Sequence, residues 1–219
     1  QENQIKKICN LAKKLNIDVL YLADSLGSLK PQNIYGIVNL FKKYWKNNLG
    51  IHAHDNMKLA LANTVTANEN GVKWVDGTVL GMGRGPGNVK TEELMKYFIK
   101  KRGQKIKINL LEKLIKKYFL PLKKKYKWGP NKYYYISGKY KIHPTYIQEI
   151  LSDKRYSKLN YLIIINNLKK IDTKKYNPYK LFESVNIFTG APKGRWRPDT
   201  MLKNKNILIV GPGDSVLKY

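Results

Sequence analysis

Apolar residues along the first hundred positions alternate between two spacings. Residues 5–15 carry apolar side chains three and four positions apart, which is typical of a helix, whereas residues 18–23 form an apolar run of strand length. This succession recurs, and such alternation with short connections predicts parallel strands joined by right-handed crossovers, as in α/β barrels and doubly wound sheets. The predicted helices are residues 5–15, a segment beginning at Pro31, residues 57–70 and a segment beginning at Thr91; the predicted strands are residues 18–23, 49–54 and 72–79.

The ends of the predicted helices carry recognisable signals. Thr91 is expected to cap its helix, because the acidic residues Glu92 and Glu93 follow in the first turn, where the helix dipole favours negative charge. After residue 104 the pattern becomes helical and rich in tyrosine. A helix is predicted to start near Asn109 and to end at Pro121. Further helices are predicted to begin at Pro144 and Pro178.

The last stretch, NILIVGPGDSVLKY, combines a strand-like run with a Gly-x-Gly turn. A glycine turn after a strand can cradle a phosphate, but the favoured interpretation is the first strand and turn of a further domain. The predicted organisation is a barrel segment at residues 1–120, a helical module at residues 121–190, and a linker with the first strand of a truncated α/β domain at residues 191–219.

Charge first suggests a polyanionic partner. The 219 residues include 42 Lys and Arg against 15 Asp and Glu, a formal charge of +27. However, 37 of the 42 cations are Lys, and Lys, Asn, Ile and Tyr together make 95 residues, a composition that an AT-rich genetic code favours. Residues 1–104 carry +8 and residues 105–219 carry +19. We therefore expect no specific nucleic-acid partner.

Composition also bears on the compartment. The single Cys9 excludes an internal disulfide framework and fits a reducing environment. No run of about 18 apolar residues is present, which excludes a membrane-spanning helix of the usual kind. The polar N-terminal segment lacks the apolar core of an export signal. A cytoplasmic location without a membrane partner is expected.

Candidate chemistry gathers where the predicted strands end. His52 and His54 are two positions apart on one strand, so both imidazoles face the same side and could hold a divalent metal. Two structural histidines would be the alternative. The preceding strand ends in Asp24 and Ser25, and the following strand ends in the loop GMGRGPGN, which contains Arg84 and Asn88. Three neighbouring strand ends with polar groups favour a functional site.

Three motifs resemble those of the pyruvate carboxyltransferase or HMG-CoA-lyase-like enzymes, also called DRE-TIM metallolyases. They are LADSLGSLKP, GIHAHDNMKLALANTVTANENGVKWVDGTVLGMGRGPGN and KTEEL. Within them the similarity is greatest to the 4-hydroxy-2-oxovalerate aldolase group, and it covers roughly residues 1–120. It implies strands five to eight of a (β/α)8 TIM barrel and a divalent Mn²⁺ or Mg²⁺ ion.

The resemblance also implies roles for individual residues. His52 and His54 would be metal ligands, with His52 also close to the substrate, and Asn88 would ligate or border the metal. Ser25 would contact a 2-oxo acid substrate. Tyr134, in WGPNKYYYISG, would be the family's proton-transferring tyrosine, although packing between helices is the alternative.

The implied function is metal-dependent cleavage of 4-hydroxy-2-oxo acids through a pyruvate enolate. The family's first-strand segment, which carries the remaining Asp ligand and a catalytic Arg, does not precede Gln1, so we expect a fragment that is inactive without that half. The alternatives are an acyl-CoA-condensing synthase resembling isopropylmalate synthase, and a basic binding module without catalysis. The tail also suggests a fused or associated second catalytic domain.

Overall fold

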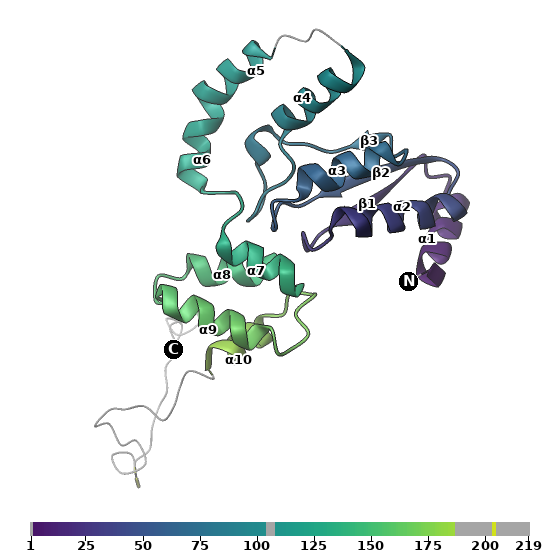
Figure 1. The fold of residues 1–219 in the computed structure, drawn as a ribbon. Coiled ribbons are helices and arrows are strands. Elements are labelled where there is room, and N and C mark those ends of the chain that lie inside the picture. The colour runs from purple at the N-terminus through teal and green to yellow at the C-terminus, as the bar shows by residue number, and fades with distance from the viewer. Residues whose placement is uncertain (1, 104–107, 187–202, 205–219) are drawn as a thin grey trace, which may run out of the picture. The chain divides into compact units, whose positions relative to one another are not determined.

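A three-stranded parallel sheet lies at the centre of the first hundred residues (Figure 1). The computed structural model describes residues 2–103, 108–186 and 203–204. Strands β1 (Val19–Asp24) and β2 (Asn48–Ala53) pair in register along their whole length, and β3 (Trp74–Val75) pairs with β2. Helices separate the strands, so every connection is a crossover, as the alternating pattern predicts. These helices are α1 (Glu2–Lys14), α2 (Pro31–Tyr44), α3 (Ala60–Glu69) and α4 (Thr91–Arg102).

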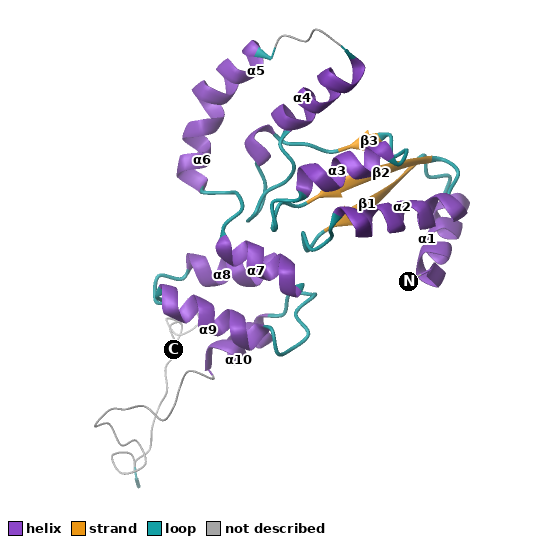
Figure 2. Cartoon of the chain, viewed as in Figure 1, coloured by secondary structure: helices purple, strands orange, loops and turns teal. Residues whose placement is uncertain are grey.

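One face of the sheet packs against these helices (Figure 2). Alternate residues of β2, namely Leu49, Ile51 and Ala53, are buried because successive side chains of a strand point to opposite faces. They belong to one apolar cluster with Ile34 and Trp45, which come from α2 and the residue after it. The opposite face carries Gly50 and the histidines, so packing on one face determines where the polar side chains of the other face stand.

Several predicted boundaries are wrong. The third strand is two residues long instead of 72–79, because Val79–Gly81 forms a short 3-10 helix and the chain leaves the sheet after Val75. The described residues therefore contain three strands, where the barrel resemblance implies four. Helix α3 starts at Ala60, whose N–H donates to the Asp55 carboxylate at 3.2 Å, and not at residue 57. Thr91 is the first residue of α4 and does not cap it, because the cap position is Lys90.

The region after residue 108 is helical, as predicted. Helix α5 (Asn109–Leu114), a π-helical turn (Ile115–Phe119) and α6 (Leu120–Tyr126) run on without interruption. Pro121 therefore does not end the helix; it lies in the first turn of α6, where the wider π turn precedes it. The remaining helices are α7 (Lys132–Tyr140), α8 (Pro144–Ser152), α9 (Lys158–Leu168) and α10 (Pro178–Asn186), and the predicted starts at Pro144 and Pro178 are confirmed.

Contacts group residues 1–185 into one compact unit and residues 186–219 into another. The predicted strand and Gly-x-Gly turn of the tail lie outside the described residues, and the domain boundaries predicted at 120 and 190 stay predictions. None of the helices in the described ranges is long and apolar enough to cross a bilayer.

Helix α7 approaches the strand ends closely. A methyl group on Gly138 would lie 2.8 Å from both the Gly27 carbonyl oxygen and the Met57 side chain. Beside it, the Asn56 side-chain amide donates to the Ser137 hydroxyl at 3.1 Å, and both residues are buried. The helical region is thereby fixed against the loops at the C-terminal edge of the sheet, where the candidate site lies.

Candidate metal and substrate site

The two predicted histidine ligands stand together at the C-terminal edge of the sheet. His52 is the fifth residue of β2, and His54 follows the strand on the same face. Their ring centroids are 5.0 Å apart, with the ring planes at 77°. The backbone of His54 pairs with that of Asn88, which brings the glycine-rich loop to the same place. The structure therefore brings His52, His54 and Asn88 together.

A carboxylate outside the predicted set orients His52. Asp76 follows β3, and its Oδ2 lies 3.0 Å from Nδ1 of His52, while its Oδ1 accepts a hydrogen bond from the Tyr21 hydroxyl at 3.1 Å. Tyr21 reaches Asp76 by lying across Gly50, where any side chain would collide with the tyrosine ring. With Nδ1 engaged, Nε2 of His52 is left to act as a ligand, in the arrangement common for metal-binding histidines.

His54 lies in a more buried environment. Burial lowers its pKa to about 4, and the charges of His52, Arg84 and His143 act in the same direction. Its Nδ1 is buried and has no hydrogen-bond partner among the described residues, and the same is true of the Asn88 side-chain oxygen. A neutral imidazole nitrogen and an amide oxygen, both buried and unpaired, are donors that suit a divalent metal.

Ser25 lies where β1 ends, directly after the last registered pair Asp24–Ala53, and is exposed. Asp24 has a different role from its neighbour. Its carboxylate is buried and accepts the N–H groups of Ser28 and Leu29 at 3.0 and 3.1 Å, which stabilises the turn before α2. Burial raises the pKa of Asp24 despite these hydrogen bonds. Of these two adjacent residues, Ser25 is the one available to a substrate.

The loop GMGRGPGN folds back on itself through close backbone contacts. Gly87 has a φ of +76°, and a methyl group there would lie 2.2 Å from the Gly81 carbonyl oxygen, so only glycine fits. The Asn88 N–H donates to that same carbonyl at 3.2 Å. This folding directs Asn88 toward His54.

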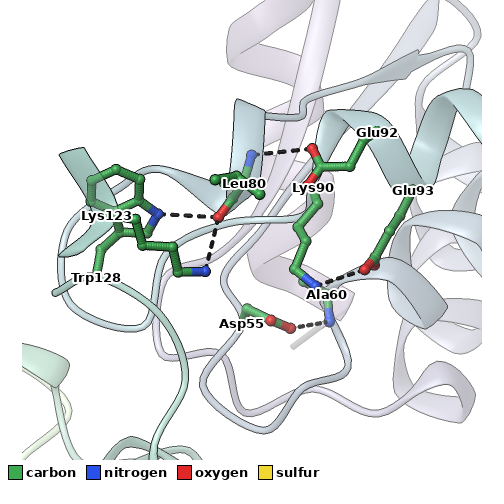
Figure 3. A network of polar contacts seen from close by, with 8 residues as sticks. All are labelled: Asp55, Ala60, Leu80, Lys90, Glu92, Glu93, Lys123 and Trp128. Atoms are coloured by element: carbon green, nitrogen blue, oxygen red, sulfur yellow. Dashed lines mark hydrogen bonds and ion pairs between the residues drawn. The ribbon is translucent and has the colours of Figure 1, made fainter. Parts of the chain in front are cut away.

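A polar network holds the start of this loop (Figure 3). The Leu80 carbonyl accepts hydrogen bonds from the Trp128 indole at 3.1 Å and the Lys123 ammonium at 3.5 Å, and the Leu80 N–H donates to Glu92 at 3.1 Å. Leu80 has a φ of +53°, which is unfavourable for a branched side chain. Three partners from two helical regions thus keep the loop in an otherwise unfavourable conformation.

Tyr134 packs against the same loop. It is 5% exposed, and its hydroxyl would lie 3.1 Å from a methyl group on Gly85. The Asn131 side chain caps α7 by accepting the N–H of Tyr134 at 3.0 Å. Burial raises the pKa of Tyr134 to about 12, with Arg84 opposing the rise, so the hydroxyl keeps its proton at neutral pH. Tyr134 therefore packs against the glycine-rich loop as well as between helices.

Two further groups lie near His54: Arg84, which is expected at the strand ends without an assigned role, and His143, which is not among the predicted site residues. The Arg84 guanidinium donates to the Thr145 hydroxyl at the start of α8. His143 caps that helix by accepting the Thr145 N–H on Nδ1 at 3.3 Å, which leaves the ring proton on Nε2. Burial lowers the pKa of His143, and the Arg84 charge adds to this. The fold brings His143 to the site from almost ninety residues after His54, and sequence spacing gives no signal of that.

The histidine pair alone does not complete a metal shell. No group of three or more His, Cys, Asp or Glu side chains is close enough to hold a metal within the described ranges. The donors that do meet are the two imidazoles and the Asn88 amide. They could form one side of a site whose remaining ligands come from substrate, water or further protein.

Comparisons with known proteins identify a matching family and similar relatives. The profile of the HMGL-like family matches residues 1–116. The chain is 40% identical over 85 residues to a 4-hydroxy-2-oxovalerate aldolase from Brevibacillus brevis, a match covering 39% of this chain and 25% of that relative. A match to the same-named enzyme of Pelotomaculum thermopropionicum, 34% identical, covers 50% and 32%. The chain thus spans a quarter to a third of these relatives.

A solved structure extends the likeness to the fold. The N-terminal domain of a protein assigned as an aldolase from Bacteroides vulgatus superposes with a TM-score of 0.64 at 34% identity, covering 73% of this chain and 51% of that one. The small parallel sheet and its helices are thus shared with structures of the TIM-barrel type.

Proposed function

Because the chain belongs to the HMGL-like family, as its motifs predict, we propose that it carries part of a divalent-metal-dependent aldolase site that cleaves 4-hydroxy-2-oxo acids to pyruvate and an aldehyde. The observation that carries the proposal is the pair of facing histidines beside Asn88, with unpaired buried nitrogen and oxygen atoms. The names of the relatives, which are aldolases, support the same reaction class.

The donor set fits Mn²⁺ or Mg²⁺ as one side of a shell. His52 and His54 would hold the ion through imidazole nitrogens, with Asn88 beside them. When bound, such an ion acts as a Lewis acid on the carbonyl oxygen of a 2-oxo acid. Asp76 fixes the ring of His52 through Nδ1, so the ring need not reorient when a ligand arrives.

The other residues of the site would bind the substrate and move its protons. Ser25, exposed at the end of β1, would donate a hydrogen bond to the 2-oxo acid. Tyr134 keeps its hydroxyl proton at neutral pH and could donate it in a hydrogen bond to the aldehyde oxygen. The packing of Tyr134 on Gly85 restricts the position of that hydroxyl.

Mn²⁺ binding tests the ligand assignment directly. In a titration followed by electron paramagnetic resonance, the unmodified chain should bind Mn²⁺, and the His52→Ala and His54→Ala variants should bind it at least about tenfold more weakly. His143→Gln is the matched control, since it removes the third histidine, which caps α8, and it should leave Mn²⁺ binding unchanged. Unchanged binding in His52→Ala would contradict the assignment.

Release of pyruvate tests the reaction class. The complete gene product is incubated with 4-hydroxy-2-oxovalerate and Mn²⁺, and pyruvate is followed with a coupled dehydrogenase. We expect release that stops when the metal is chelated and that the His52→Ala substitution abolishes. Metal-independent release, or consumption of acetyl-CoA in place of pyruvate release, would contradict the proposed function.

A further inference from the structure

A cavity adjoins the glycine-rich loop. Its volume is about 590 Å³, and its walls are the Met82–Gly85 part of the loop, residues 126–128 at and after the end of α6, and residues of α7 and α8. Tyr134 forms part of the wall, so the cavity touches the candidate site. Neither the histidine pair nor its implied metal uses this space.

The charges around the cavity are all of one sign. Arg84 and Lys127 line it, and among the described residues its lining contains no Asp or Glu. The Arg84 guanidinium points to Thr145, the second residue of α8, and forms no ion pair with any described carboxylate. The N-terminus of a helix is itself the positive end of its dipole. The helix N-terminus at this cavity is that of α7, whose cap residue Asn131 lines it. Arg84, Lys127 and this positive helix end repel one another until an anion joins them.

Tyr134 forms part of the same wall. The residue is 5% exposed, and its hydroxyl is not among the buried atoms of the described residues that lack a hydrogen-bond partner. An anionic ligand in this cavity would therefore be bound chiefly by the Arg84 guanidinium.

We propose that this cavity binds an anionic group, a carboxylate or a phosphate, on the aldehyde half of the substrate, and that Arg84 is its main ligand. The proposal rests on the proposed function, since it places the leaving half of a 4-hydroxy-2-oxo acid beyond Tyr134. Arg84 suits the role, because a planar guanidinium matches two oxygens of a carboxylate or phosphate. Among 4-hydroxy-2-oxo acids, those with a second negative charge at the far end should then bind more tightly than 4-hydroxy-2-oxovalerate, whose far end is a methyl group.

Binding of unreactive analogues tests this without metal or turnover. The probes are 4-hydroxybutanoate, glycerol 3-phosphate and butan-1-ol, each titrated into the protein by calorimetry in the presence of a chelator. We expect one of the two anions to bind and the neutral alcohol not to bind, and the better anion identifies the group. The Arg84→Gln variant should weaken that binding by about tenfold or more, because it removes a charge-assisted hydrogen bond.

Arg102→Gln is the matched control, since it removes the same charge from an exposed arginine at the end of α4. It should bind the anion as the unmodified protein does. Equal loss in both variants would show attraction to net charge alone and would overturn the proposal, as would equal binding of the alcohol. Because no metal is present, failure here with intact Mn²⁺ binding overturns only the anion site, whereas lost Mn²⁺ binding overturns the proposed function.

Discussion

The two faces of the β1–β2–β3 sheet differ in what their side chains do. On one face, Leu49, Ile51 and Ala53 are buried among the apolar side chains of the helices. On the other face, Tyr21 and His52 form polar contacts with Asp76 while remaining partly exposed. Because successive strand residues point to opposite faces, Ile51 contributes to stability, whereas the next residue, His52, belongs to the candidate site. Stability and chemistry can therefore be changed separately by substitutions at neighbouring residues.

The largest expected effect is a loss of stability on the face of the sheet that packs against the helices. Ile51 is fully buried, so Ile51→Ala should lower the free energy of unfolding by about 2–5 kcal/mol. The neighbouring change His52→Ala should lower it by less than about 1 kcal/mol, since His52 is partly exposed. Urea unfolding followed by circular dichroism measures both. Similar losses at the two positions would show that the two faces of β2 contribute equally to stability.

The next largest effect is expected on metal affinity, at the face of the sheet that carries His52. Asp76→Asn keeps the size of the side chain but removes the charge beside Nδ1 of His52. We expect Mn²⁺ affinity to fall by about 10–100-fold, the usual result of losing such a supporting carboxylate. Unfolding in urea should change little. A large loss of stability without a change in Mn²⁺ affinity would show that Asp76 is only structural.

A smaller effect should appear as a pH dependence of stability in metal-free protein. The pKa of His54 is lowered, chiefly by burial, from 6.5 to about 4 in the folded state. As pH falls from about 6.5 to 4, the unfolded state takes up the proton first, so the stability present above pH 6.5 is lost. His54→Gln should lose less stability over that interval, measured as the shift in urea midpoint between pH 7 and pH 4.5. Parallel curves for the two proteins would contradict the burial of a neutral His54.

The smallest effect is expected at Tyr21. Tyr21→Phe removes one partly exposed hydrogen bond to Asp76 and should cost about 0.5–1.5 kcal/mol or less. The same change should weaken Mn²⁺ binding less than Asp76→Asn does. If the two substitutions weakened Mn²⁺ binding equally, Tyr21 would be as necessary as the carboxylate for orienting His52.

Much of the fold follows from the spacing of apolar residues. The alternation of helix and strand and the shared face of His52 and His54 were predictable, because both depend on the local period of side chains. The end of β3 was not predictable from this period, because it depends on how Val79–Gly81 turns toward α4. Pro121 was misleading for a similar reason, because the π-helical turn before it accommodates the proline within a continuous helix.

The parts of the site that escaped prediction are those assembled by tertiary contacts. Asp76 follows a strand end, where polar groups gather, and that position is a signal that could have found it. His143 and Thr145 carry no such signal, since only the folding of α8 against the loop brings them to Arg84.

The close approach of α7 to the strand ends limits how this protein can evolve. Gly138 leaves no room for a methyl group beside the Gly27 carbonyl and the side chains of Asn56 and Met57. A larger residue at 138 would need a smaller one at 57 or a displaced turn at 27, so these distant positions should covary among homologous sequences. Exchanging the helical region or the sheet alone between relatives would therefore require matching changes where Gly138 contacts Gly27, Asn56 and Met57.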